Sequence, residues 1–264
     1  MTAATGATQV AGAARAAVEV ARADRIVVLT GAGMSAESGI PTFRDALTGL
    51  WAQYSPDELA TPQAFLADPP RVFGWYLQRW RAVRDVQPHA GHLALASLQR
   101  WAASFVVITQ NIDRLHQRAG IADVIELHGA LEAFRCWERG HPFDVTALAA
   151  RDGDAPVDPP HCSVCGSVVR PGVVWFGEML PVEAMRRAER LLAECDLLLV
   201  IGTSGLVYPA AGLPLVARRA GAVVVEVNPE PTPITPLADA VLREPAGSAL
   251  AAIVERLEHG PSHV

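Results

Sequence analysis

Lysine is absent from this sequence: among its 264 residues, all 22 basic side chains are arginines. Without lysine, the chain cannot form a Schiff base with a carbonyl substrate. It also cannot complete a P-loop, in which a lysine contacts the nucleotide phosphates. The missing residue type therefore excludes two large groups of enzyme mechanisms.

Long apolar runs, a cysteine framework and concentrated positive charge are missing as well. No apolar run approaches the roughly 20 residues of a membrane span. Four cysteines, one of them (Cys195) at the start of an apolar run, do not make a secreted disulfide framework. The net charge is −6 and the arginines are scattered, which argues against a nucleic-acid groove. We therefore expect a cytoplasmic monomer with neither a membrane nor a nucleic acid as a partner.

The composition, 50% hydrophobic and 19% charged, is that of a globular protein with a substantial core. Short runs rich in Val, Ile and Leu are continuous rather than alternating, which is typical of parallel strands covered on both faces. Helical patterns at 182–194 and 210–220 separate some of them. We predict an α/β fold with a Rossmann-like, doubly wound parallel sheet. The predicted strands are 25–30, 104–109, 123–127, 196–201 and 222–227.

Two regions interrupt the alternation of strands and helices. Residues 41–100 contain a helical stretch, PPRVFGWYLQRWRAVRD, but no strand, and residues 130–172 contain three of the cysteines with little periodicity. We expect both to form a second, smaller inserted module, helical in one part and a degenerate zinc knuckle in the other. The remaining predicted parts are a tail and helix at 1–22, the Rossmann-like domain at 23–40, 101–129 and 173–258, and a C-terminal tail at 259–264.

The stretch GAGMSAESGIPTFRD, residues 31–45, follows the first predicted strand and contains the G-x-G-x-x-A pattern of a dinucleotide site. Such a turn brings backbone N–H groups and a helix N-terminus to a pyrophosphate. However, Pro41 cuts the helix short, and Trp51 stands where an acidic ribose reader is expected. The pattern therefore indicates NAD bound in a different way from a dehydrogenase, and a plain strand–helix turn is its alternative.

Several longer strings carry a family resemblance. GAGMSAESGIPTFRD, TQNIDRLHQRAG (109–120), ELHG (126–129), RPGVVWFGE (170–178), GTSGLVYPAAGLP (202–214) and NPEP (228–231) occur in this order. Together they closely resemble the sirtuins, the NAD-dependent protein-lysine deacylases, from about residue 25 to residue 250. The resemblance implies that NAD is a co-substrate: nicotinamide is expelled and the acyl group leaves on ADP-ribose. It also implies acylated-lysine proteins or peptides as substrates and nicotinamide as a product inhibitor.

His128 directly follows the predicted strand 123–127, at the sheet edge where open α/β folds bind ligands. A neutral imidazole suits removal of a proton at cellular pH. From the residues alone, a strand-end histidine bonded to a loop is the alternative reading; the match of ELHG to the family implies that His128 is the general base. The resemblance implies catalytic roles for Asn111 and Asp113 too, and one of these two could also cap the next helix.

The resemblance further implies which residues hold NAD. Gln110 and Asn111 are expected at the ribose beside nicotinamide, and Ile112 and Asp113 at the carboxamide, with Ala32 and Ile40 as apolar walls. The turn Asn228-Pro229-Glu230, after the strand 222–227, is expected to be the missing ribose reader. The whole implied set is Gly31, Ala32, Gly33, Ser35, Ala36, Ile40, Phe43, Arg44, Gln110, Asn111, Ile112, Asp113, Gly202, Thr203, Ser204, Asn228, Pro229, Glu230 and Ala246.

Two further segments are implied to bind the substrate. In sirtuins the segment Val174, Trp175, Phe176, Gly177 pairs with the extended peptide, although from the residues alone it would be an ordinary core strand. Tyr76 and Arg79 lie three apart, on one face of a helix, and we expect Tyr76 at a rim with its hydroxyl free. The pair matches the sirtuin branch that removes succinyl and malonyl groups, where it binds the distal carboxylate; a solvated arginine beside a tyrosine is the alternative.

Cys162 and Cys165 form one half of a zinc knuckle. The other half should be a second C-x-x-C, but Cys136 is followed three residues later by Arg139, which cannot bind zinc. We expect Cys136, Cys162 and Cys165 as metal ligands, with His141 or His161 as the fourth or with the site vestigial.

Two other functions are compatible with an NAD site. A mono-ADP-ribosyltransferase would use the same nicotinamide release, and a non-catalytic NAD-sensing module would use binding alone. The retained His128, Asn111 and Asp113 argue against the second.

Overall fold

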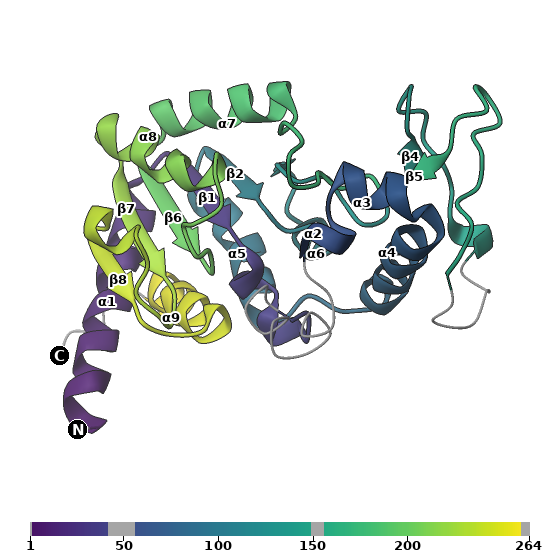
Figure 1. Ribbon diagram of the computed structural model, residues 1–264. Coiled ribbons are helices and arrows are strands. Elements are labelled where there is room, and N and C mark those ends of the chain that lie inside the picture. Colours follow the sequence, from purple (N-terminus) through teal and green to yellow (C-terminus); the bar gives the residue numbers. More distant parts are fainter. Residues whose placement is uncertain (1, 42–55, 149–155, 260–264) are drawn as a thin grey trace.

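The computed structural model describes residues 2–41, 56–148 and 156–259. Its main feature is a six-stranded, all-parallel sheet of order β3-β2-β1-β6-β7-β8 (Figure 1). The predicted α/β fold is confirmed. The strands are β1 (Arg25–Thr30), β2 (Ser104–Thr109), β3 (Val124–Glu126), β6 (Leu197–Ile201), β7 (Val223–Val227) and β8 (Ala240–Leu242).

Strand β8 was not predicted, because its apolar run contains only one β-branched residue and is bounded by Asp239 and Arg243. It pairs with β7 and completes the far edge of the sheet.

The topology places three strand ends together. From β1 the chain runs outward through β2 and β3 on one side and through β6, β7 and β8 on the other. In the ladder, Thr30 of β1 is level with Thr109 of β2 and with Ile201 of β6. A doubly wound sheet opens a crevice where its strand order reverses, at the carboxyl ends of the strands. The turns after β1, β2 and β6 therefore meet there.

Helices cover both faces of the sheet, as the continuous apolar strands predict. Helices α1 (Thr2–Arg22), α5 (Ala90–Leu98) and α9 (Ala246–His259) lie on one face, and α7 (Val182–Glu194) and α8 (Leu213–Arg219) lie on the other (Figure 1). Successive β1 residues alternate between the two cores: Ile26 and Val28 face α1, α5 and α9, whereas Val27 and Leu29 face α7 and α8. Within the described ranges, no helix has the length and apolar character needed to cross a membrane.

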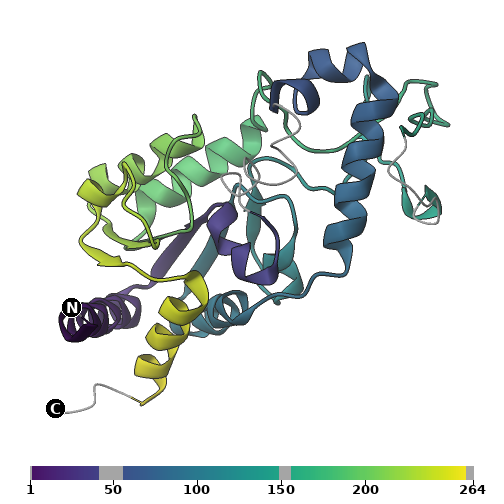
Figure 2. The ribbon, with the colours of Figure 1, turned by 60° about the horizontal axis from the view of Figure 1, so that its bottom comes forward.

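A smaller module projects from one side of the sheet (Figure 2). It holds α2 (Pro56–Leu59), α3 (Pro62–Ala67), α4 (Pro69–Arg84), the 3-10 turn η6 (Thr146–Leu148) and the antiparallel pair β4 (Arg135–Cys136) and β5 (Val169–Arg170). Each longer helix starts with a cap and a proline: Thr61 Oγ1 accepts a bond from the Ala64 amide, and Asp68 Oδ1 accepts one from the Arg71 amide.

The two interrupting regions share one apolar core. Phe65 and Phe73 from the first region pack with Phe134 and Val169 from the second. Helix α5, by contrast, places Leu95 in the core beneath the sheet. The exact boundary of the inserted module stays a prediction.

Candidate active site

The turns after β1 and β6 are packed against each other. The Gly33 amide donates to the Gly202 carbonyl at 2.8 Å. A Cβ atom on Gly31 would lie 2.8 Å from Thr203 Cα, and one on Gly202, whose φ is +60°, would lie 2.3 Å from the Met34 nitrogen. These glycines are therefore required by the contact between the two turns, whatever ligand the turns bind.

The predicted helix after β1 is two short 3-10 turns, η1 (Ala32–Met34) and η2 (Ala36–Ser38), which end at Gly39 with φ +82°. The Glu37 carboxylate accepts a 2.7 Å bond from the Gly247 amide, next to Ala246 in the first turn of α9. This bond holds η2 against the N-terminus of α9, where an anionic side chain is favoured.

A buried polar network joins the turn after β2 to the turn after β1. Asn111 Nδ2 donates to the Gly31 carbonyl and to Ser35 Oγ, both at 3.0 Å, and Ser35 Oγ donates to Asp113 Oδ2 at 2.8 Å. Asp113 Oδ1 accepts a 2.9 Å bond from the Leu115 amide, at the start of α6 (Leu115–Arg118). Asp113 thus binds the first amide of α6 from outside the helix; the N-cap residue is Arg114, so the expectation that Asn111 or Asp113 is the N-cap is wrong.

Burial raises the pKa of Asp113, and the bonds from the Leu115 amide and Ser35 oppose this shift. The network thus holds Asn111 and Asp113 in fixed orientations at the carboxyl edge of the sheet.

His128 stands beside this network with a defined tautomer. Its Nδ1 lies 2.9 Å from the Gln110 carbonyl oxygen. A carbonyl oxygen can only accept, so Nδ1 carries the proton and Nε2 of the neutral ring is an acceptor. Burial lowers the pKa of His128, and the bond to Gln110 opposes that shift. The ring is therefore kept neutral, in the form that a general base needs.

Gln110 and Asn228 complete the connections between the turns. Gln110 Nε2 donates to Thr203 Oγ1 at 3.0 Å, and Asn228 Nδ2 donates to the Thr203 carbonyl at 2.9 Å. Pro229 and Glu230, which follow Asn228, are exposed. The turns after β1, β2, β6 and β7 thus form one connected edge.

The other implied NAD contacts divide into three groups. Ala32, Ile40, Ile112 and Ser204 are half-buried on these same turns, and Ala36 is exposed. Phe43 and Arg44 lie outside the described residues.

Three histidines form a buried cluster that the sequence did not reveal. The rings of His89 and His92 have centroids 4.4 Å apart, and those of His92 and His116 are 5.0 Å apart. His89 Nε2 donates to the Met34 carbonyl while its Nδ1 accepts from the Gly91 amide, and His116 Nε2 lies 2.9 Å from Thr30 Oγ1. Burial lowers the pKa of His92 to about 2 and that of His116 to about 4. The neutral rings of the cluster thus pack against the carboxyl end of β1, where His116 contacts Thr30.

The segment expected to pair with substrate lies next to His128. Gly129 bridges Val173, and the Val174 amide donates to the His128 carbonyl at 2.9 Å. Beyond Val174 the chain turns, so the alternative of an ordinary core strand is wrong for this segment. Phe176 is 44% exposed, and its amide bonds to the Ala60 carbonyl.

A buried arginine fixes the shape of this segment. Arg170 Nη1 and Nη2 bond to the two carboxylate oxygens of Glu178 at 2.5 and 2.9 Å, and Glu178 also accepts from the Trp175 amide at 2.8 Å. The Arg170 guanidinium lies 3.7 Å from the Trp175 ring centroid, a cation–π contact.

The expectation of a free Tyr76 hydroxyl at a rim is wrong. Tyr76 is buried at 4% exposure, and its hydroxyl accepts a 3.0 Å bond from Trp175 Nε1. The reason is that α4 packs this face against the aromatic core of the module, which includes Phe65. Burial raises the pKa of Tyr76 to about 12 and lowers that of Arg79, whose guanidinium lies 4.7 Å from the Trp75 ring centroid.

The cysteine module contains a four-residue ligand set. The ligand atoms of Cys136, His141, Cys162 and Cys165 all lie within 4.8 Å of one another. The Cys136 and Cys165 sulfurs are 3.6 Å apart, close to the separation of about 3.8 Å that zinc–sulfur bonds of about 2.3 Å give in a tetrahedron. A Cys3His set of this kind fits zinc.

The structure selects His141 as the fourth ligand. His141 Nδ1 lies 3.5 Å from the Cys162 sulfur. His161, the other candidate, instead has Nδ1 2.9 Å from the Gly166 carbonyl. Arg139, at the position of the missing cysteine, is exposed.

Comparison with known proteins agrees with this geometry. The Sir2 family profile matches residues 31–209. An NAD-dependent protein deacylase of Ralstonia nicotianae is 49% identical over 95% of this chain and 99% of its own length. The crystal structure of a Sir2 homologue bound to NAD is 45% identical over 93% of each chain, with a TM-score of 0.85.

A second structure is a mutant Sir2 protein with a deacetylated p53 peptide and 3′-O-acetyl-ADP-ribose. It is 34% identical over 93% of this chain and 97% of its own, with a TM-score of 0.80. The chain therefore belongs to the Sir2 family, the sirtuins.

Proposed function

We propose that this protein is an NAD-dependent protein-lysine deacylase that moves the acyl group of a modified lysine onto ADP-ribose. The observation that carries the proposal is the state of His128. Its Nδ1 is held by the Gln110 carbonyl, so Nε2 accepts protons at the sheet edge beside the buried Asn111 network. The names of the relatives and the ligands of the related structures support the same reaction.

The residues at the sheet edge fit NAD. Small residues at the turns after β1 and β6, such as Ala32 and Ser204, allow phosphates to approach the backbone. When bound, NAD supplies the ADP-ribosyl group that accepts the acyl group and releases nicotinamide. Asp113 and the Ile112 backbone would hold the carboxamide of the nicotinamide, and Gln110 and Asn111 would hold the adjoining ribose.

In this reaction the side chains of the protein orient the two substrates, exclude water from the site and transfer one proton. His128 Nε2 accepts the proton of a ribose hydroxyl, and the Gln110 carbonyl stabilises the imidazolium that results because it accepts from Nδ1. Ala32 and Ile40 provide apolar walls that keep water from competing as a nucleophile. The segment from Val173 to Glu178, shaped by Arg170, receives the peptide.

We further propose an acyl specificity, an inhibitor, a metal ion and a cellular location for this protein. Tyr76 and Arg79 support removal of succinyl and malonyl groups as well as acetyl groups, because a guanidinium can bind the distal carboxylate. We propose nicotinamide as a product inhibitor, zinc at the Cys3His set as a structural ion, and a cytoplasmic monomer as the working form.

The test is mass spectrometry of the products from NAD and one peptide carrying acetyl-lysine or succinyl-lysine. We expect free lysine peptide, nicotinamide and acyl-ADP-ribose in equal amounts. Labelled nicotinamide should also exchange into NAD when an acyl peptide is present. ADP-ribosylated peptide in place of acyl-ADP-ribose would instead show a mono-ADP-ribosyltransferase, and the absence of both products would overturn the proposal.

A further inference from the structure

Arg118, the last residue of α6, bonds to two separate parts of the protein, the turn after β2 and the end of α4. Its Nη2 donates to the Asp113 carbonyl at 2.6 Å. Its Nη1 donates to the Arg84 carbonyl at 2.9 Å and to the Val86 carbonyl at 2.7 Å. One guanidinium therefore connects the turn after β2 with the carboxyl end of α4 in the smaller module.

The acceptors at the end of α4 suit an arginine. The last carbonyls of a helix have no partner within the helix and carry partial negative charge. Val83, close to the end of α4, also lies within reach, its carbonyl oxygen 3.3 Å from Nη1. A planar guanidinium spreads five N–H donors over three nitrogens, whereas the three donors of a lysine ammonium share one nitrogen and span a shorter distance.

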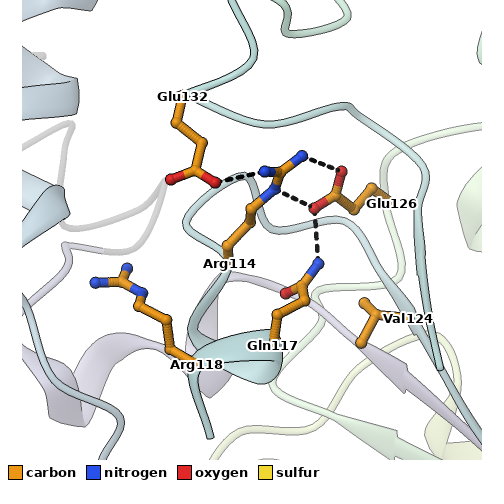
Figure 3. A pocket seen from close by; sticks show the side chains of 6 residues that line it. All are labelled: Arg114, Gln117, Arg118, Val124, Glu126 and Glu132. Atoms are coloured by element: carbon orange, nitrogen blue, oxygen red, sulfur yellow. Dashed lines mark hydrogen bonds and ion pairs between the residues drawn. The ribbon is translucent and has the colours of Figure 1, made fainter. Parts of the chain in front are cut away.

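Arg114, in the same segment, has a different set of partners. Its guanidinium bonds to the carboxylates of Glu126 and Glu132, and Figure 3 shows Arg118 on the opposite side of Arg114 from Glu126, with no bond drawn to either carboxylate. The two arginines line the same pocket but bond to different partners. Arg114 makes partly buried ion pairs, and of the two arginines only Arg118 bonds to the backbone of Asp113.

Both ends of the Arg118 connection lead to proposed substrate groups. Asp113 belongs to the network with Ser35 and Asn111. Helix α4 carries Tyr76, about two turns before its carboxyl end, and Tyr76 bonds to Trp175 in the peptide segment. A shift of α4 relative to the Asp113 turn would change the distance between the nicotinamide side and the acyl side of the site.

We propose that Arg118 is a positioning residue that sets the smaller module against the Asp113 turn and so aligns the acyl-lysine with the nicotinamide ribose. This role rests on the proposed deacylase function. Arg118 touches neither substrate; it acts through Asp113 and α4. Binding of ADP-ribose alone, which needs neither the nicotinamide position nor the acyl peptide, does not depend on it.

Hydrogen exchange of the intact protein tests the connection independently of activity. In the Arg118→Met variant, amides at 83–87 and at 112–116 should exchange about 10-fold faster, because a charge-assisted bond on each segment is lost. The matched control, Arg114→Met, should leave residues 83–87 unchanged. Unchanged exchange at 83–87 in Arg118→Met would overturn the assignment.

Exchange of labelled nicotinamide into NAD, measured with an acetyl peptide, tests the consequence. In Arg118→Met the rate should fall by about 10-fold or more, and Arg118→Lys should be intermediate, while calorimetry with ADP-ribose should give a Kd within about 2-fold of the parent. Arg114→Met should match the parent in both measurements.

Three results would overturn the positioning role: equal exchange rates in Arg118→Met and Arg114→Met, full recovery by lysine, or a parallel loss of ADP-ribose affinity. A parent protein with no nicotinamide exchange would instead refute the proposed function, and the hydrogen exchange would still decide the connection.

Discussion

The indole nitrogen of Trp175 donates a 3.0 Å hydrogen bond to the hydroxyl of Tyr76, and both side chains are buried. This bond joins α4 to the segment proposed to receive the peptide. The bond uses a lone pair of the Tyr76 oxygen, so the O–H proton is the group that could donate to a bound carboxylate.

The first prediction is that Tyr76→Phe destabilises the protein by about 1–3 kcal/mol, because the Trp175 indole N–H would be left buried without a partner. Urea unfolding measures the change in free energy. The control is Tyr208→Phe: Tyr208 is 78% exposed, and its change should stay within about 0.5 kcal/mol. Equal effects of the two substitutions would show that the bond contributes nothing.

Arg79→Met should lower activity on succinyl-lysine much more than activity on acetyl-lysine. We expect kcat/KM for a succinyl-lysine peptide to fall roughly 10–100-fold, the loss of a charge-assisted bond to the carboxylate, with acetyl turnover nearly unchanged. Steady-state kinetics with two peptides of identical sequence measure the ratio. Equal losses with both peptides would return Arg79 to a structural role.

His128→Ala should lower deacylation by about 10²–10⁴-fold with the fold retained, the usual effect of removing a general base. Circular dichroism checks the fold. His161→Ala, which changes an exposed histidine in the cysteine module, is the control and should keep parental activity. Activity of His128→Ala within a few-fold of the parent would refute the assigned base.

Elemental analysis of the purified protein should find about one zinc per chain. Cys162→Ser and His141→Ala should lose it, since each removes one ligand of the Cys3His set. His161→Ala should retain it, since His161 lies outside the set. Zinc retained in His141→Ala but lost in His161→Ala would reverse the choice of the fourth ligand.

The buried histidines predict a loss of stability in acid. Unfolded histidine titrates near 6.5, whereas burial holds the pKa of His92 at about 2 and that of His116 at about 4. Below about pH 6.5 the unfolded chain therefore binds more protons than the folded protein. The free energy of unfolding decreases as the pH is lowered, by roughly 2 kcal/mol for each histidine between pH 7 and pH 4.5.

Urea unfolding at both pH values measures the acid effect. His116→Gln should show a smaller difference between them, because glutamine binds no proton in this range. Its neighbours in the cluster, His89 and His92, and nearby Arg118 are unchanged in this comparison. Equal differences for the parent and His116→Gln would contradict the prediction.

The local pattern of the sequence was sufficient for the sheet and for the residues along its edge. Continuous apolar runs predict buried parallel strands, and parallel strands necessarily bring their carboxyl ends to one edge. For this reason Gly31, Asn111, His128 and Gly202 could be placed together from the sequence alone. The strand of this sheet that was not predicted, β8, has one β-branched residue between Asp239 and Arg243, whereas the equally short β3 has Val124 and Ile125 side by side.

Tertiary packing decided the contacts between segments that are distant in the chain. Helical spacing put Tyr76 and Arg79 on one face, but only the fold turned Tyr76 inward to Trp175. The cysteine spacing left His141 and His161 as alternative fourth ligands, and the pairing of β4 with β5 brought His141 to the sulfurs. The histidine cluster likewise joins His92 to His116, 24 positions along the chain, and the Arg118 bonds reach Arg84, 34 positions away. Periodicity reports which side of an element is apolar, whereas the partner it meets depends on how whole elements pack.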